Sequence, residues 1–424
     1  MFALNEGYRW RSASFADNLH GVVYLAAFND AERMRRRPLG EFAWQIFDPQ
    51  LYLAGLDGDE SAKVCARLAS HRWFCVDDVP QFDSGESTQT AWQQAVQDHV
   101  RNNWTGDPPP DDRINECVRA AIEFQADLRC THILAPTPLV NEREDEAEAV
   151  GNWLDAALQA AESLDFGQPL IATVAVSEAV LNDRSFNAGG FLDTIADQVT
   201  SRDGLGGVYI VIAQTQKRHP LSAPENVTRA YAHLTRAFVD AGSDFVFVNF
   251  ADVFGVACAG LGASGFATGP TQSLRRLCLD ALVDDQFGVP FPHLYSHPVI
   301  AEFLPEGELA RIAERNLLQL VTDRTVHSRD LFEALRQGRD VSQVAAWAES
   351  RNNVTAASKH FIARMIREAS DYADLSSDER LARSREWLQN AVLNQDALQR
   401  RAALDTTPAY APAQEWQDHL ERYG

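Results

Sequence analysis

The sequence predicts an α/β fold: a (β/α)8 TIM-like barrel with an insertion after its second strand and an all-helical C-terminal region. The first observation is that short runs of β-branched and aromatic residues alternate with longer amphipathic stretches between residues 131 and 251. This alternation indicates a parallel sheet, because parallel neighbours need a crossover connection. The second observation is the number of runs, about eight over roughly 280 residues, which is near the usual size of a barrel. An open doubly wound sheet is the other arrangement consistent with the alternation.

The predicted strands follow one another along the first 300 residues. In chain order they are residues 21–28, 44–52, 131–140, 169–176, 207–214, 244–251, 262–268 and 291–297. The runs GVYIVIAQ (207–214) and DFVFVNFA (244–251) are almost entirely apolar, as expected for strands buried on both faces.

The chain divides into three parts on its sequence pattern. Residues 1–304 form the predicted barrel, and the segment at about 53–128 is interpreted as an insertion or a lid because it is longer than one crossover. Residues 305–406 show helical spacing only, which predicts a helical C-terminal region. The tail at 407–424 is expected to be loosely ordered.

Composition limits the partners of the chain. Its 38 basic and 60 acidic residues give a formal net charge of −22, which disfavours a nucleic-acid partner because like charges repel. The six cysteines form no CxxC pair and have no histidine cluster beside them, so neither a metal nor a disulfide framework is expected, and no cofactor is indicated. The absence of a signal peptide and of a membrane-spanning apolar run predicts a soluble cytoplasmic protein.

The stretch CAGLGASGFATG (258–269) contains a G-x-G-x-x-G pattern. A dinucleotide-binding fingerprint is disfavoured, because the preceding predicted strand ends well before the glycines. Two interpretations stay open. In the first, Gly262, Gly265, Thr268 and Gly269 hold an anion at a barrel loop, with Arg275 and Arg276 adding positive charge if either turns inward. In the second, the glycines only relieve crowding where the barrel closes.

Polar residues stand at the predicted carboxyl ends of the strands, where barrel enzymes place their catalytic groups. Carboxylates can act as acid and base, and a histidine can carry protons near neutral pH. The candidate catalytic residues are Asp48, Glu178, Asp252, His293 and His297, and the candidate ligand-binding residues are Gln50, Thr137, Gln214, Asn249 and Tyr295. Each of them taken singly is also explained by a turn, a cap or loop packing.

One segment resembles a known family. RINECVRAAIEFQADLRCTHILAPTPL (113–139), with Gln125, and Asp83-Ser84-Gly85 resemble motifs of the tRNA-guanine transglycosylase superfamily. The resemblance implies a barrel, a base-exchange reaction and a catalytic role for Asp83. The chain departs from the family pattern because its strand tip is Pro136-Thr137 rather than an acid and because the zinc cysteines are absent.

These observations lead to two functional hypotheses. The first is a barrel enzyme of glycosyl or nucleobase transfer or hydrolysis. It would act on a small polar ligand, either phosphorylated or not, with carboxylates as acid and base. The second is a catalytically inert barrel that serves as a binding or assembly component, with a protein partner at its helical C-terminal region.

Overall fold

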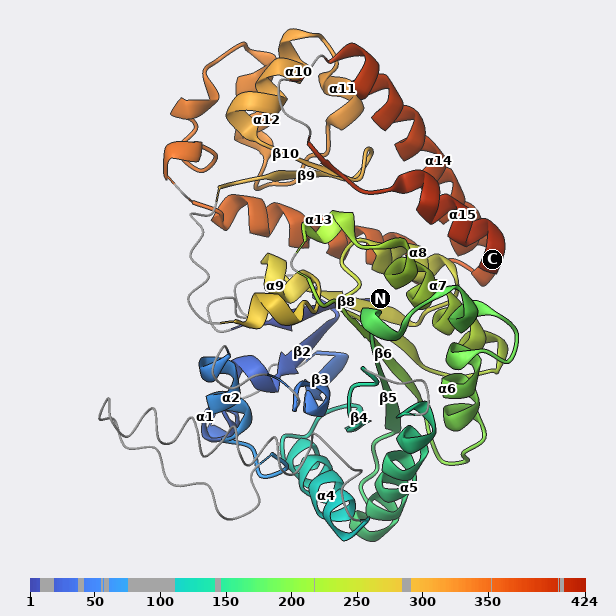
Figure 1. Cartoon of the computed structure of the whole chain (residues 1–424). Coiled ribbons are helices and arrows are strands. Elements are labelled where there is room, and N and C mark those ends of the chain that lie inside the picture. Colours follow the sequence, from blue (N-terminus) through green and yellow to red (C-terminus); the bar gives the residue numbers. More distant parts are fainter. Residues whose placement is uncertain are drawn as a thin grey trace.

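The computed structural model contains an eight-stranded parallel barrel with helices between its strands and a further C-terminal region (Figure 1). The residues that the structure describes are 1–7, 19–36, 42–54, 56, 61–74, 111–141, 146–216, 218–283, 291–351, 353–402, 404 and 408–424. Among these residues no helix is long and apolar enough to cross a membrane.

The barrel sheet has the strand order β3-β2-β1-β8-β7-β6-β5-β4. Its strands are β1 (Phe2–Glu6), β2 (Gly21–Leu25), β3 (Trp44–Asp48), β4 (Ile133–Ala135), β5 (Leu170–Ser177), β6 (Gly207–Ala213), β7 (Val246–Asn249) and β8 (Gly265–Thr268). The two ends of this order meet, because Ile46 of β3 forms a parallel bridge with His132 beside β4. The Thr131 amide also donates to the carbonyl of Gln45 over 2.9 Å. The predicted TIM-like fold is therefore confirmed.

The prediction misses the first barrel strand and wrongly places the run 291–297 as the last one. Phe2–Glu6 is the first strand, pairing with β2 on one side and β8 on the other. The run at 291–297 lies outside the barrel, because β9 (Leu294–Ser296) pairs antiparallel with β10 (Ala301–Phe303). Each strand predicted between them therefore stands one place later in the barrel. The physical reason is that the short apolar run FALNE closes the ring between β2 and β8, which leaves no place for another strand.

Helices surround the barrel in the crossover positions. They are α1 (Ala31–Arg36), α2 (Ala62–Leu68), α4 (Asp111–Asp127), α5 (Glu146–Leu164), α6 (Phe191–Thr200), α7 (Glu225–Asp240), α8 (Phe254–Gly260) and α9 (Gln272–Arg275). The proposed insertion at about 53–128 follows β3, the third strand, rather than the second. It includes α2 and α4, and α4 packs on both β4 and α5, so this part is an ordinary crossover helix.

The C-terminal region packs directly on the barrel. Helix α13 (Thr355–Ala373) lies between the barrel and the rest of this region and contacts β1, α8 and β9 (Figure 1). Its residues Phe361, Ile362 and Met365 belong to the same buried cluster as the barrel side chains. Because α9 is only four residues long, α13 covers the side of the barrel at β8 and β1 that a longer helix after β8 would cover.

A second, smaller core lies within the C-terminal region. It joins the sheet β9–β10 to the shorter helices, whose bounds are α10 (Ala310–Glu314), α11 (Leu318–Val321) and α12 (Arg329–Arg336). Helix α14 (Ser377–Arg401) reaches both cores, because Leu388 belongs to the barrel cluster and Leu398 to the smaller one. Residues 305–406 thus contain helices and no strand among the described positions, as predicted.

The tail expected to be loosely ordered is instead structured over most of its length. Strand β11 (Ala409–Tyr410) joins β10, and helix α15 (Ala413–Tyr423) packs against α7, α8 and α14. Trp416 and Leu420 of α15 are fully buried in the barrel cluster. The sequence pattern alone does not reveal this packing. Burial of these two apolar side chains against existing helices offsets the chain entropy that is lost when the tail becomes ordered.

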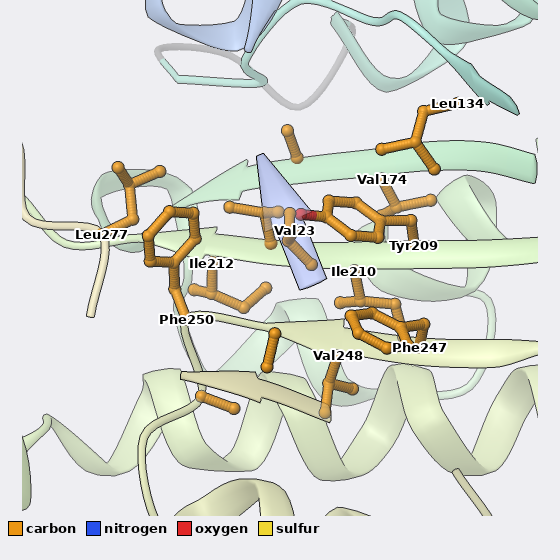
Figure 2. Close-up of a cluster of buried hydrophobic side chains, with 14 of the residues drawn as sticks. Val23, Leu134, Val174, Tyr209, Ile210, Ile212, Phe247, Val248, Phe250 and Leu277 are labelled. Atoms are coloured by element: carbon orange, nitrogen blue, oxygen red, sulfur yellow. The ribbon is translucent and has the colours of Figure 1, made fainter. Parts of the chain in front are cut away.

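Aromatic side chains fill the interior of the barrel. The Tyr209 and Phe247 rings of the neighbouring strands β6 and β7 stack with centroids 5.6 Å apart (Figure 2). Trp44 meets Phe247 and Phe245 edge-on at 5.5 and 5.6 Å. The amino-terminal part of the barrel is therefore filled by aromatic side chains, and polar inward-facing residues are found toward the carboxyl ends of the strands.

Candidate functional site

A chain of hydrogen-bonded polar side chains crosses the carboxyl end of the barrel. Asn5 of β1 donates from Nδ2 to Asn249 Oδ1 on β7 over 2.7 Å. Asn249 in turn donates from Nδ2 to the Tyr209 hydroxyl, and that hydroxyl donates to Asp48 Oδ2 over 2.8 Å. Asn5, Asp48 and Asn249 come from alternate strands, as expected for one layer of inward-pointing side chains in a barrel. Asp48 and Asn249, both predicted site residues, are thus brought together.

Asp48 is a carboxyl group held in an apolar barrel with several donors. It is 1% exposed, and its Oδ2 accepts a second hydrogen bond from the Tyr52 hydroxyl over 2.6 Å. Burial raises the pKa of Asp48 to about 6, against the opposing effect of the hydrogen bonds from Tyr52 and Tyr209. A carboxyl group with this pKa exchanges its proton close to neutral pH, which is the property of a general acid or base.

Gln50 positions the Asp48 turn rather than standing free at the strand end. Its backbone amide donates to Asp48 Oδ1 over 3.0 Å, and its side-chain Oε1 accepts from the Ala27 amide over 2.8 Å. Gln50 has a left-handed backbone with φ of 51°, an uncommon conformation for a residue other than glycine. The strained turn after β3 is therefore fixed by hydrogen bonds on two sides, and strain of this kind concentrates at functional sites.

Two predicted residues stand side by side at the ends of β5 and β6 with unused polar atoms. Ser177 and Ala213 are paired in the sheet, so Glu178 and Gln214 follow at the same level. Glu178 Oε1 accepts from the Thr215 hydroxyl over 2.9 Å, whereas its Oε2 is buried and has no partner among the described residues. The same holds for Gln214 Nε2. A carboxylate oxygen and an amide nitrogen are thus left for hydrogen bonds to a further group.

Asp252 takes part in a buried ion-pair network, not in a free acid–base pair. Its Oδ1 lies 2.6 Å from Arg275 Nε, and Arg275 also pairs with Glu302 of β10. His219 Nε2 lies 2.9 Å from the other Glu302 oxygen. Burial raises the pKa of Glu302, but Arg275 and His219 outweigh it and hold that pKa well below its usual range. The network joins the end of β7 to the C-terminal region.

The histidines and the tyrosine predicted from the run 291–297 do not stand at a barrel strand end. Tyr295 lies in β9, and its hydroxyl is 3.1 Å from His297 Nδ1. His297 stacks on Trp387 of α14 with ring centroids 4.7 Å apart, and its Nε2 lies 3.3 Å from Glu368 of α13. His293 contacts only its local backbone in the hydrogen bonds of the described chain, at the carbonyl of Phe291. The reason for the error is that this run pairs with β10.

The glycine stretch spans both ends of β8 and so does not form one cradle. Gly262 and Gly265 lie at the amino end of the strand, whereas Thr268 and Gly269 lie at its carboxyl end. The four residues of β8 separate the two groups by roughly 10 Å at about 3.3 Å per residue. One small anion therefore cannot contact all four residues.

Local packing accounts for each of these glycines. A side chain at Gly265 would overlap the Trp44 ring, and one at Gly269 would overlap Leu274. Gly262 has a φ of +106°, in the region that favours glycine. Gly260 allows Ser384 of α14 to approach α8. These contacts agree with the crowding interpretation of the sequence.

The remaining residues named from the sequence are Thr137, Thr268, Gln125 and Asp83. Thr137 donates its hydroxyl to the carbonyl of Thr173 over 3.0 Å, and Thr268 Oγ1 is buried with no partner in the ranges that the structure describes. Gln125 donates to the carbonyl of Leu134 over 2.9 Å, so it fixes α4 against β4. Asp83 lies outside the described residues.

Neither a metal site nor a disulfide is present in the described part of the chain. No group of three or more His, Cys, Asp and Glu side chains is placed there to hold a metal ion. Four of the described cysteines are buried free thiols, namely Cys117, Cys130, Cys258 and Cys278. Burial raises the pKa of the Cys258 thiol to about 12, so this thiol is not activated as a nucleophile.

Several polar residues of this end of the barrel were not predicted. Tyr209 lies within an almost wholly apolar run. Because a buried tyrosine hydroxyl needs a hydrogen-bond partner, a tyrosine in such a run is itself a sign of a buried polar contact. Asn5 follows a short apolar run in the same way as Asp48 and Asn249 do. Nothing in the sequence links Arg275 to Glu302, because that pairing depends on how the second sheet packs.

Comparison of the chain with protein-family models, curated proteins and solved structures finds no match in any of the three. The fold therefore rests on the strand order and register, and the resemblance to the tRNA-guanine transglycosylase superfamily rests on the sequence motifs alone.

Proposed function

We propose that the protein is a barrel enzyme that acts on a small polar ligand at the carboxyl ends of β3, β5 and β6. The observation that carries this proposal is the pair of buried atoms at adjacent strand ends, Glu178 Oε2 and Gln214 Nε2, that have no partner among the described residues. A buried polar atom without a partner costs free energy, and a ligand bound at the strand ends would supply partners for both atoms.

The proposed chemistry is glycosyl or nucleobase transfer or hydrolysis. Asp48, whose pKa burial raises to about 6, serves as the proton donor, and Glu178 serves as the carboxylate that acts as a base or stabilises positive charge. Tyr52 and Tyr209 hold Asp48 in place and share its negative charge once the proton has left. This division gives two carboxyl groups with different surroundings and hence different roles.

The test is an assay of bond cleavage with the purified protein. Nucleosides, nucleotides, glycosides and sugar phosphates are incubated with it, and release of the free base or sugar is followed by chromatography. We expect turnover of one compound class, with Asp48→Asn and Glu178→Gln each lowering kcat by about 100-fold or more. Turnover that survives both substitutions would rule out the assigned roles.

A second candidate function is an inert barrel that binds a partner through its C-terminal region. The observation in its favour is that Asp48 is fully buried with both oxygens satisfied, as in a purely structural polar layer. In the described chain Leu393 of α14 is an exposed large apolar side chain at 61%. In this case no compound of the panel would be turned over, and Leu393→Glu would lower the mass of any assembly measured by light scattering.

A further inference from the structure

Arg276 is a buried guanidinium that has no hydrogen-bond partner in the described part of the chain. It directly follows α9 and is 3% exposed. Its Nε, Nη1 and Nη2 atoms are all buried, and none has a partner among the described residues. An arginine side chain carries five N–H donors and stays charged in proteins, so leaving it unpaired in the interior is costly. The position therefore calls for an acceptor from outside the chain.

The neighbouring Arg275 shows what a paired arginine looks like in the same place. It contacts the carboxylates of Asp252 and Glu302, and its guanidinium lies 4.1 Å above the Phe361 ring. Both Asp252 oxygens accept from Arg275, over 2.6 and 3.3 Å, and neither accepts from Arg276. The Asp252 charge acts on Arg276 across space and is opposed by Arg275, but it gives the Arg276 N–H groups no acceptor.

The other groups near Arg276 are already engaged. The Tyr231 hydroxyl of α7 accepts from the Ile212 amide and donates to the Asn249 carbonyl. Glu415 of α15 lies close enough for the Arg276 charge to act on its pKa, but its Oε1 accepts from the Thr228 hydroxyl over 2.9 Å. Burial lowers the pKa of Arg276 itself, which is the expected effect of an uncompensated interior cation.

We propose that Arg276 binds the oxyanion group, a phosphate or a carboxylate, of the ligand that this protein acts on. The guanidinium fork matches two oxygens of such a group, and the carboxyl ends of the last two strands are where barrels commonly bind phosphate. The identity of the rest of the ligand rests on the proposed function, whereas binding of the oxyanion group does not. The proposed anion-binding element is thus Arg276 and not the glycine stretch 258–269.

An oxyanion reaches Arg276 only when a covering side chain moves, because the guanidinium nitrogens have no exposed surface. Among the neighbours named above, Tyr231 and Asp252 are buried, whereas Glu415 is partly exposed. Glu415 is therefore the neighbour among these three that borders solvent, and its negative charge opposes an incoming anion.

The experiment compares thermal unfolding of the wild type, Arg276→Met and Arg275→Met in chloride, phosphate and acetate at constant ionic strength. Removal of an unpaired buried charge predicts that Arg276→Met is at least as stable as the wild type without ligand. Arg275→Met leaves two buried carboxylates without their cation and is expected to have a lower Tm. Phosphate or acetate at about a hundred times its Kd raises the wild-type Tm by roughly 3–5 °C, and Arg276→Met loses this rise.

Three outcomes would overturn the inference. The first is a Tm loss in Arg276→Met as large as that in Arg275→Met, which would make Arg276 structural. The second is a phosphate or acetate effect that Arg276→Met retains. The third is no effect of either anion on the wild type.

A second variant covers the case in which Arg276→Met does not fold. Arg276→Lys keeps the charge without the two-pronged guanidinium, and at least a tenfold weaker anion Kd is expected. Preference for phosphate over acetate identifies a phosphorylated ligand. None of these readouts requires turnover.

Discussion

Two groups of polar side chains at the carboxyl end of the barrel differ in how far their polar atoms are paired. Asn5, Asn249, Tyr209 and Asp48 form one continuous hydrogen-bonded chain, in which Asn5 Oδ1 alone lacks a partner among the described residues. Glu178, Gln214 and Arg276 each keep at least one buried polar atom without a partner in the same part of the chain. Extensive pairing fixes a core in one arrangement, whereas incomplete pairing destabilises the free protein and is relieved by a ligand. The difference separates a preorganised chain, which holds the proposed proton donor Asp48, from a group left open for a ligand.

The largest expected effect comes from breaking the buried ion-pair network of Asp252, Arg275 and Glu302. Arg275→Met leaves Asp252 and Glu302 buried without their cation, and we expect a loss of about 3–5 kcal/mol in the free energy of unfolding. Urea denaturation measures this directly. The matched control is Arg276→Met, the adjacent arginine without a partner. A loss below about 1 kcal/mol in Arg275→Met would show that the pairing contributes little.

The next effect is a pH dependence that Asp48 imposes on stability. Its pKa is raised from 3.8 to about 6 in the folded state, so the native protein binds more protons than the unfolded chain in that window. The contribution of Asp48 to stability therefore falls as pH rises from about 4 to about 6. The Asp48→Asn variant has no carboxyl group that titrates at this position. The unfolding free energy of the variant minus that of the wild type should therefore rise by about 3 kcal/mol across the window.

Denaturation curves of both proteins at several pH values test this prediction. Glu302 and Glu368, whose pKa values are lowered in the folded state, lose stability on acidification in both proteins and cancel in the difference. Parallel stability profiles of wild type and Asp48→Asn would contradict the assigned surroundings of Asp48.

A smaller effect is expected from the glycines that the packing explains. Gly265→Ala introduces a methyl group into the Trp44 ring, and we expect a loss of about 1–3 kcal/mol in the free energy of unfolding. The control is Gly307→Ala, because a side chain there meets nothing within 4 Å. Equal stability of the two variants would argue against crowding as the reason for glycine at position 265.

The smallest effect on stability is expected in the group left open for a ligand. Glu178→Gln keeps an oxygen for the Thr215 hydroxyl and removes a charge whose second oxygen has no partner, so the unfolding free energy should change by less than about 1 kcal/mol. Ligand binding and turnover should nevertheless fall strongly. A large loss of stability in Glu178→Gln would place this residue with the structural group instead.

The sequence was sufficient for the fold because burial on both faces marks parallel strands clearly, as in the runs around Tyr209 and Phe247. It was insufficient for the strand Phe2–Glu6, which is short and is recognisable only from its two neighbours in the sheet. The run around Tyr295 has the composition of a barrel strand, and only its pairing with β10 places it elsewhere.

The candidate site was predictable in part for the same reason. Asp48, Glu178 and Gln214 were found because they follow apolar runs, and this position along the chain defines the carboxyl end of a parallel strand. The ion pair of Asp252 with Arg275 and the isolation of Arg276 depend on side-chain packing between distant segments. Periodicity and spacing carry no information about such contacts.

The most direct test of the central claim, that the mouth of the barrel binds a small polar ligand, is a thermal-shift screen of the purified protein. The panel contains nucleobases, nucleosides, nucleotides, glycosides and sugar phosphates. We predict that one compound class raises the Tm by a few degrees, and that Glu178→Gln reduces the rise while leaving the Tm of the free protein nearly unchanged. A Tm that no compound changes, or a rise that persists in Glu178→Gln, would contradict the claim.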